Sequence, residues 1–295
     1  MSSQPGILGE VATQARSLSF DLRGGEAAPL LRARLQRLAA LLDPAAAVVG
    51  LGEPLLRALG KTVPGLRSFP ALTGPGCAVP STQHALWVEL TGGDRGTLAQ
   101  RAAEVREALG DAFVLAGDLA AFKHREGRDL SGYLDGTENP RAGKAAAAAL
   151  VAGAGPGLDG GSFAAVQRWR HDLAHFNALP EPERDHVIGR RLSDDEELED
   201  APPSAHVKRT AQESFDPEAF MVRRSLPWIE GGEQGLLFVA FVENLDRYER
   251  VLRRMAGLED GVTDALLRFS QPQSGAYFWC PPVREGRVDL AAIGG

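Results

Sequence analysis

The first 125 residues alternate between two spacings of apolar positions, one typical of strands and the other of helices. Leu18, Phe20 and Leu22 are separated by polar residues, as expected of a half-buried strand. Leucines then recur at 31, 35, 38 and 42, which predicts an amphipathic helix over about 26–42.

Four more elements follow in this part of the chain. They are a strand at 47–51, an alternating strand at 86–90, a helix at 98–109 and a strand at 113–116. The segment 70–82 contains proline and glycine and is predicted to be a loop. Strand, helix, strand, strand, helix, strand is the ferredoxin-like order, in which two helices cover one face of an antiparallel sheet.

The same order of elements returns after residue 125. Strands are predicted at 163–169, 220–224, 236–242 and 276–279, with a helix at 245–256 and a short one near 263–269. The alanine- and glycine-rich stretch at 141–161 is predicted to be a loop or, over its alanines, a short helix. We therefore expect an α+β protein of two ferredoxin-like halves, 1–125 and 126–295, with a long insertion at about 141–215.

Composition limits the functions open to this chain. Its 295 residues are 44% hydrophobic and 24% charged, which is typical of a globular protein. The net charge of −7 argues against nucleic-acid binding, and no apolar run approaches the roughly 20 residues that span a membrane. The N-terminus shows no signal-peptide pattern and the two cysteines no metal or redox spacing, so we expect a cytoplasmic protein with reduced thiols.

Three separate stretches carry the candidate chemistry. Asp135 lies in Gly-Tyr-Leu-Asp-Gly-Thr-Glu-Asn-Pro (132–140), where glycines leave little bulk beside the carboxylate. His206 lies in a second stretch, and Arg223 with Ser225 in a third. Singly they have ordinary explanations: an Asp-Gly turn, a surface or core histidine, and a strand arginine in an ion pair. Together they are what a buried redox cofactor with one axial ligand needs.

These stretches resemble the dye-decolorizing peroxidase family, in the subgroup known as B-type. The family's Gly-x-x-Asp-Gly motif is matched at 132–136 and extends to Thr-Glu-Asn-Pro. Its proximal haem histidine is matched by His206, and its distal arginine, followed two residues on by Asn or Ser, by Arg223 and Ser225. The resemblance continues through 235–238 and 263–267. It implies a haem peroxidase with one haem b per chain, held in the C-terminal half.

The resemblance also implies roles on the open side of the iron. Asp135 would move the proton of hydrogen peroxide, and Arg223 would stabilise the charge that develops as the O–O bond breaks. Arg224 is the other candidate for the arginine role. Ser225 would order a water molecule, and Leu236 and Phe238 would form the apolar roof.

On the other side, His206 would be the metal ligand of the haem iron. Asp264 would accept a hydrogen bond from its second ring nitrogen, although Asp264 is equally suited to cap a helix. Arg190 would contact a haem propionate, unless it is simply a surface arginine. The backbone of Thr137, Glu138 and Asn139 would line the haem edge.

The expected reaction uses hydrogen peroxide to oxidise small aromatic, phenolic or dye-like reductants by one-electron steps. A haem-handling protein with incidental peroxidase activity is the alternative. A third possibility is a non-haem metal site on a helix carrying His171 and His175, although no zincin glutamate follows the first histidine.

Relatives of this kind are commonly homo-oligomers, and some are packaged in encapsulin shells through a C-terminal tail. The chain ends at 289–295 without a long linker, which argues against such packaging.

Overall fold

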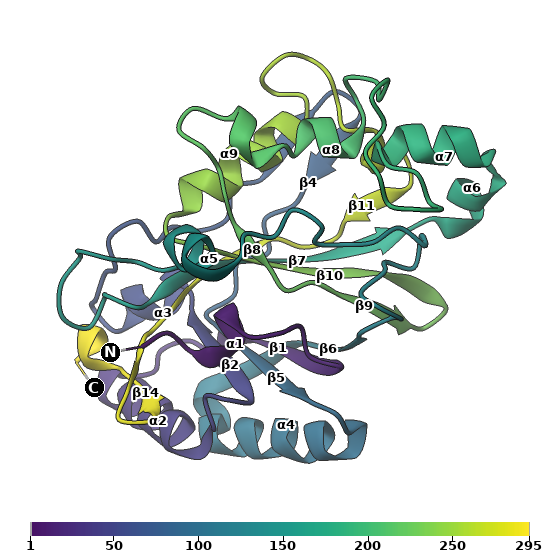
Figure 1. Ribbon diagram of the computed structural model, residues 1–295. Helices are drawn as coiled ribbons and strands as arrows, with labels where there is room; N and C mark the ends of the chain where they lie inside the picture. The colour runs from purple at the N-terminus through teal and green to yellow at the C-terminus, as the bar shows by residue number, and fades with distance from the viewer. Residues whose placement is uncertain (1, 295) are drawn as a thin grey trace.

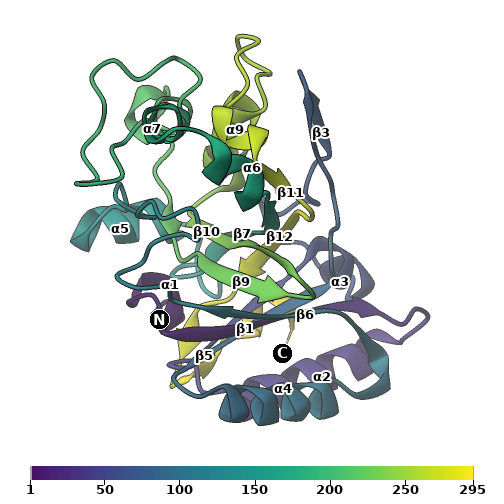
Figure 2. The same ribbon diagram turned by 90° about the vertical axis from the view of Figure 1, so that its right-hand side faces the viewer.

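The computed structural model describes residues 2–294 and has four layers, with two sheets stacked between two layers of helices (Figure 1, Figure 2). Helices α2 (Ala28–Leu41) and α4 (Arg95–Leu109) form the lowest layer in both views. Helix α9 (Leu245–Met255) lies in the uppermost layer, above the second sheet.

The first half forms the ferredoxin-like unit that its periodicity predicts. Its strands are β1 (Gln14–Leu22), β2 (Ala47–Leu51), β5 (Leu86–Gly92) and β6 (Phe113–Phe122). They lie in the order β6-β1-β5-β2, and each neighbouring pair is antiparallel. Helix α4 begins where Asp94 accepts a hydrogen bond from the Thr97 N–H, and it ends at Gly110, whose φ of +56° suits glycine.

The second half repeats this arrangement. Its strands are β7 (Ser162–His171), β8 (Val222–Arg223), β9 (Leu226–Glu230), β10 (Glu233–Val242), β11 (Ser270–Pro272) and β12 (Ala276–Cys280). The order is β12-β7-β10, with β8 and β9 both on the outer edge of β10 and β11 beside β7. The strand predicted at 220–224 is only Val222–Arg223, and the separate strand β9 follows it. Helix α9 buries Leu245, Tyr248, Leu252 and Met255, as predicted.

The connections contain short helices and two small hairpins. The helices are α1 (Pro5–Leu8), α3 (Glu53–Ala58), α5 (Ala142–Ala149), α6 (Leu173–Ala178), α7 (Glu181–Ile188) and α8 (His206–Arg209). The hairpins are β3 (Leu72–Gly74) with β4 (Cys77–Val79), and β13 (Val283–Arg284) with β14 (Arg287–Val288). The first hairpin lies inside the segment predicted as a loop, because strands of three residues are too short to show a period. No helix between residues 2 and 294 has the length and apolar character needed to cross a membrane.

The structure contradicts the predicted helix that would carry both His171 and His175. His171 is the last residue of β7 and is buried, whereas His175 is exposed on α6. The chain turns at Asp172, whose side chain caps α6 by accepting the His175 N–H. The two imidazoles therefore share no helical face, and residues 2–294 contain no cluster of three metal-ligating side chains.

An apolar core lies between the two sheets. It is built from strand positions that face away from the helices, among them Trp87, Trp228, Phe241 and Phe278. Trp87 stacks on Phe278 across the interface, with ring centroids 5.8 Å apart. The sheets also join at one edge, where Trp279 of β12 pairs with Leu51 of β2. Both faces of the central strands are therefore buried.

The two halves interlock at their ends. The fully buried side chain of Gln4 donates to the carbonyl oxygens of Val49 and Pro281, and its own carbonyl accepts from the Val49 N–H. Ser2 pairs with Val283 through two backbone hydrogen bonds. The start of the chain thus ties the first sheet to the segment that follows β12.

One charged side chain interrupts the core between the sheets. Glu89 of β5 is 5% exposed, and its Oε1 has no hydrogen-bond partner among residues 2–294. Burial raises the pKa of Glu89 to about 8. The folded protein therefore binds this proton more tightly than the unfolded chain does. The free energy of unfolding is unaffected by Glu89 below its ordinary pKa and falls as the pH rises towards 8.

We expect Glu89→Gln to make the protein more stable than wild type at pH 8, by a few kcal/mol at about 1.4 kcal/mol per unit of pKa shift. The difference should shrink as the pH falls towards 4.5, and urea unfolding at a series of pH values measures it. Glu104→Gln, on the exposed side of α4, is the control. A gain that is equal at pH 5 and pH 8 would contradict the assignment.

Candidate active site

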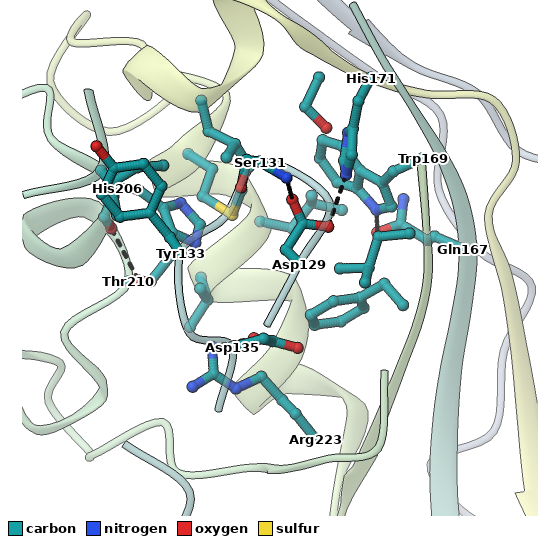
Figure 3. Close-up of a pocket in the computed structure, with 18 of the residues that line it drawn as sticks. Asp129, Ser131, Tyr133, Asp135, Gln167, Trp169, His171, His206, Thr210 and Arg223 are labelled. Carbon is teal, nitrogen blue, oxygen red and sulfur yellow. Dashed lines mark hydrogen bonds and ion pairs between the residues drawn. The ribbon is translucent and has the colours of Figure 1, made fainter. Parts of the chain in front are cut away.

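A cavity lies on the face of the second sheet that α8 and α9 cover (Figure 3). It has a volume of about 130 Å³ for the centres of water-sized molecules, which is far more than one water molecule needs. Strands β7 and β10, helices α8 and α9, and the loop 129–135 all contribute side chains. Most of the lining is apolar, and it includes Leu236 and Phe238.

His206 forms one wall of the cavity. It is the first residue of α8, and its Nδ1 lies 2.8 Å from Oδ2 of Asp264. The Asp264 side chain is fully buried. Because the carboxylate only accepts hydrogen bonds, Nδ1 is the protonated nitrogen and Nε2 remains free for a metal. Asp264 also caps the 3-10 helix η3 (Ala265–Arg268) by accepting the Leu266 N–H, so both roles considered for it are compatible.

Helix α8 has only four residues, so contacts with its surroundings must hold it. The guanidinium of Arg209 is nearly buried and donates two 2.8 Å hydrogen bonds to Asp260 and one to the Arg254 carbonyl. These bonds lower the pKa of Asp260 to about 2. The Ala265 N–H donates to the Ser204 carbonyl, which joins the segment before His206 to η3. His206 is thereby fixed at both ends of its helix.

Asp135 and Arg223 lie across the cavity from His206 (Figure 3). Arg223 Nη1 is 4.0 Å from Asp135 Oδ1, which is too long for a hydrogen bond. The Nε of Arg223 is buried and has no partner within residues 2–294. Both side chains are thus held close together and retain hydrogen-bonding capacity for a ligand between them.

Asn139 fixes Arg223 relative to the loop that carries Asp135. Its Oδ1 accepts the Arg223 N–H at 2.8 Å, and its Nδ2 donates to the Arg223 carbonyl at 3.1 Å. An amide can satisfy one donor and one acceptor in this way, which a carboxylate cannot. The Asn of Thr-Glu-Asn-Pro therefore binds the backbone of the segment that carries the arginine.

The loop before Asp135 is anchored by a buried Asp–His pair. Asp129 Oδ2 lies 3.1 Å from His171 Nε2, and its Oδ1 accepts the Ser131 N–H. Burial alone would raise the pKa of Asp129, but the hydrogen bonds from His171 and Ser131 outweigh it and lower the pKa. The pairing with Asp129 was missed by sequence reasoning, which considered His171 only as a metal ligand.

Two more contacts hold the same loop. Arg128 donates to both carboxylate oxygens of Asp195, and the Tyr133 hydroxyl donates to Asp185 at 2.5 Å. Burial and the bond to Asp185 raise the pKa of Tyr133, so its phenol stays protonated at ordinary pH. Asp135 is therefore presented by a loop tied to β7, α7 and the acidic segment after it.

The other predicted residues lie near this cavity without lining it. Ser225 lines a neighbouring cleft, and its hydroxyl is buried without a partner among residues 2–294. Arg190 Nη2 donates to Glu138 at 2.7 Å, and Nη1 donates to the Asp195 carbonyl. Thr137 is half-buried in the same loop.

Comparison with known proteins agrees with this geometry. Residues 126–285 match the family model for the C-terminal region of Dyp-type peroxidases. The dye-decolorizing peroxidase of Mycobacterium tuberculosis is 31% identical over 224 residues, which cover 74% of this chain and 67% of that protein. That of Rhodococcus erythropolis is 31% identical over 258 residues, covering 84% and 76%.

The chain belongs to the dye-decolorizing peroxidase family. Solved structures of this family superpose over nearly its whole length. The dye-decolorizing protein from V. cholerae has a TM-score of 0.86 at 29% identity and covers 99% of both chains. The encapsulated peroxidase from Mycobacterium smegmatis has a TM-score of 0.84 at 27% identity, covering 99% and 97%. A Rhodococcus jostii DypB variant in complex with heme has a TM-score of 0.82 at 26% identity, covering 93% and 94%.

Membership of the dye-decolorizing peroxidase family makes this chain a peroxidase with haem as its cofactor. The cavity fits that group chemically. It offers one histidine whose Nδ1 is already satisfied, a largely apolar wall, and an arginine with an unpartnered buried nitrogen. The α+β fold of two ferredoxin-like halves is likewise confirmed.

We expect Asp264→Asn to weaken haem binding by about 10-fold to 100-fold, because a neutral partner makes the His206 imidazole a poorer donor. Asparagine retains the oxygen that caps η3, so the thermal midpoint of the apoprotein should change little. Haem transfer to apomyoglobin and the reduction potential of the iron measure the effect. Wild-type values for both would show that Asp264 serves only as a cap.

We expect His171→Leu to loosen the loop 128–136, because Asp129 would keep a buried charge without its donor. Such a loss costs about 3–5 kcal/mol. His171→Gln places an amide N–H near the position of Nε2 and should preserve most of the stability. Amide hydrogen exchange and urea unfolding of the apoproteins measure both variants. Equal protection of the loop in the two variants would refute the anchoring role.

Proposed function

We propose that this chain reduces hydrogen peroxide and oxidises small aromatic, phenolic or dye-like molecules, with His206, Asp135 and Arg223 as the acting residues. The observation that supports this best is the position of the His206–Asp264 pair across one apolar cavity from Asp135 and Arg223. In balanced form, one peroxide and two reductant molecules give two waters, and each reductant loses one electron and one proton.

His206 would hold the haem through Nε2, since Nδ1 is bonded to Asp264. Haem, when bound, supplies an iron that accepts two oxidising equivalents from peroxide. Leu236 and Phe238 keep the cavity apolar, which excludes water and strengthens the electrostatic interactions within it. Contacts at the edge of the cofactor are proposed for the segment beside Asp135 and the arginine bonded to it: Thr137, Glu138, Asn139 and Arg190.

Asp135 is positioned to carry a proton between the two oxygens of peroxide. Its carboxylate would take the proton from one oxygen and return it to the other as the O–O bond breaks. Such transfers contribute typically about 10²-fold to 10⁴-fold to a rate. The loop contacts described above hold the carboxylate in place, so little reorganisation is needed during the transfer.

Arg223 supplies the positive charge. Its Nε is buried with no partner in the described structure. A donor that is already desolvated and oriented stabilises developing negative charge at little cost in reorganisation. The weak 4.0 Å contact with Asp135 leaves the guanidinium free to bind peroxide.

We also propose a cytoplasmic, homo-oligomeric protein. Cys77 and Cys280 are both free, which agrees with a reducing compartment. The similarity to an encapsulated peroxidase from Mycobacterium smegmatis supports a test of packaging, by co-expression with a shell protein. Light scattering of the purified holoenzyme would give the oligomeric state.

We expect Asp135→Asn to keep the Soret band of bound haem but to slow its change after one equivalent of hydrogen peroxide by about 10²-fold or more. His206→Ala should lose or displace the Soret band itself. Asp200→Asn, in the exposed acidic loop, is the control and should match wild type. Haem bound through His206 with only a sluggish reaction in wild type would instead favour haem handling.

A further inference from the structure

A cleft adjoins the haem cavity at Asp135 and Arg223. Asp135, Arg223 and Leu236 line both spaces, so the pair forms the boundary between them. The cleft has a volume of about 700 Å³ for the centres of water-sized molecules. Its walls come from both halves of the chain, because residues 8–11 and 123–124 face the segment 223–227 across it. This volume far exceeds what hydrogen peroxide requires.

Arg224 is a half-buried cation in the cleft wall that lacks an acidic partner. No carboxylate of residues 2–294 pairs with it, whereas Asp135 stands beside the adjacent Arg223. Its Nη1 donates to the Arg223 carbonyl, and its buried Nε has no partner. Burial without a compensating charge lowers the pKa of Arg224. A desolvated cation of this kind gains free energy when an anion binds it.

The next residue adds a second unused donor. Ser225 is 9% exposed, lines the cleft, and has a buried hydroxyl with no partner in the described chain. A buried hydroxyl without a hydrogen-bond partner is destabilising, and a bound acceptor would remove that cost. A carboxylate placed at this point could accept from both side chains at once.

The rest of the cleft is suited to an aromatic anion. Lys123 and Arg141 are exposed cations on its wall without ion-pair partners, and within residues 2–294 only Glu10 is a correspondingly unpaired acid. Arg224 brings the unpaired cations to three. The lining between Arg224 and Asp135 includes the apolar side chains of Leu226, Pro227 and Leu236.

We propose that this cleft is a binding site for phenolic acids as reductants. Arg224 and Ser225 hold the carboxylate, the apolar wall packs against the ring, and the phenol is directed towards Asp135. The assignment rests on the proposed peroxidase function and specifies its preferred substrates as anionic aromatics. The positive charge of Lys123 and Arg141 at the cleft attracts such anions.

The first test measures binding to the haem-loaded protein in the absence of peroxide. We expect 4-hydroxybenzoate to bind at least 10-fold more tightly than its uncharged methyl ester in titration calorimetry. Arg224→Gln should weaken binding of the acid by about 10-fold to 100-fold, as expected for a charge-assisted hydrogen bond. It should have much less effect on the ester. Lys144→Gln removes an exposed charge beside the cleft but outside its lining, and should bind both compounds as wild type does.

Equal affinity for acid and ester, or equal losses for both in Arg224→Gln, would overturn the proposal. Acetate binding as tightly as 4-hydroxybenzoate would also overturn it, since the site would then recognise only an anion. If Arg224→Gln does not fold, as judged by circular dichroism, Ser225→Ala replaces it, with an expected loss of about 3-fold to 10-fold for the acid alone.

The second test uses the holoenzyme. The ratio of kcat/KM for the acid to kcat/KM for the ester should fall by at least 10-fold in Arg224→Gln, chiefly through KM for the acid. An unchanged ratio would refute the substrate assignment while leaving the peroxidase function intact. Failure of wild-type holoenzyme to oxidise either compound would instead count against the proposed function, and the binding experiment without peroxide would still decide whether the cleft holds phenolic acids.

Discussion

Burial of both faces of the central strands is the constraint on which the rest of this structure depends. Packing two sheets against each other removes one face of each from water, and helices cover the opposite faces. Trp87, Trp228 and Phe278 are fully buried in the space between the sheets, which is close-packed. The haem cavity therefore lies on the outer side of the second sheet, where connecting segments can supply polar groups.

Those connecting segments need support that secondary structure does not give them. His206 starts a helix of four residues, and Asp135 lies on an irregular loop. The contact of Arg209 with Asp260 holds the helix that carries His206, and the contact of Asp129 with His171 holds the loop that carries Asp135. None of these four supporting residues is assigned a part in the chemistry. Such contacts are what allow a site built on loops to keep the geometry that proton transfer requires.

Asp135 and Arg223 have an unusual position because two spaces meet at them. On one side is the apolar cavity of the cofactor, and on the other is a wide cleft shared by both halves of the chain. Within residues 2–294, the N-terminal half contributes side chains to the cleft but none to the haem cavity.

The sequence by itself determined the order and type of the main elements and singled out Asp135, His206 and Arg223 as candidates for the chemistry. Spacing at Leu18, Phe20 and Leu22 and along the leucines of α2 is a local property, so it survives in the printed chain. Asp135, His206 and Arg223 could be named because each lies in a distinctive short motif. Only the tertiary structure decided which residues meet. Asp129 pairs with His171, which is 42 positions away in the sequence, and Asn139 binds Arg223, which is 84 positions away. The periodicity of apolar residues carries no information about contacts at such sequence separations. The tertiary structure also differs from the alternation of buried and exposed residues expected at 86–90. Trp87 and Glu89 are buried because a second sheet covers the face that a lone sheet would leave in water.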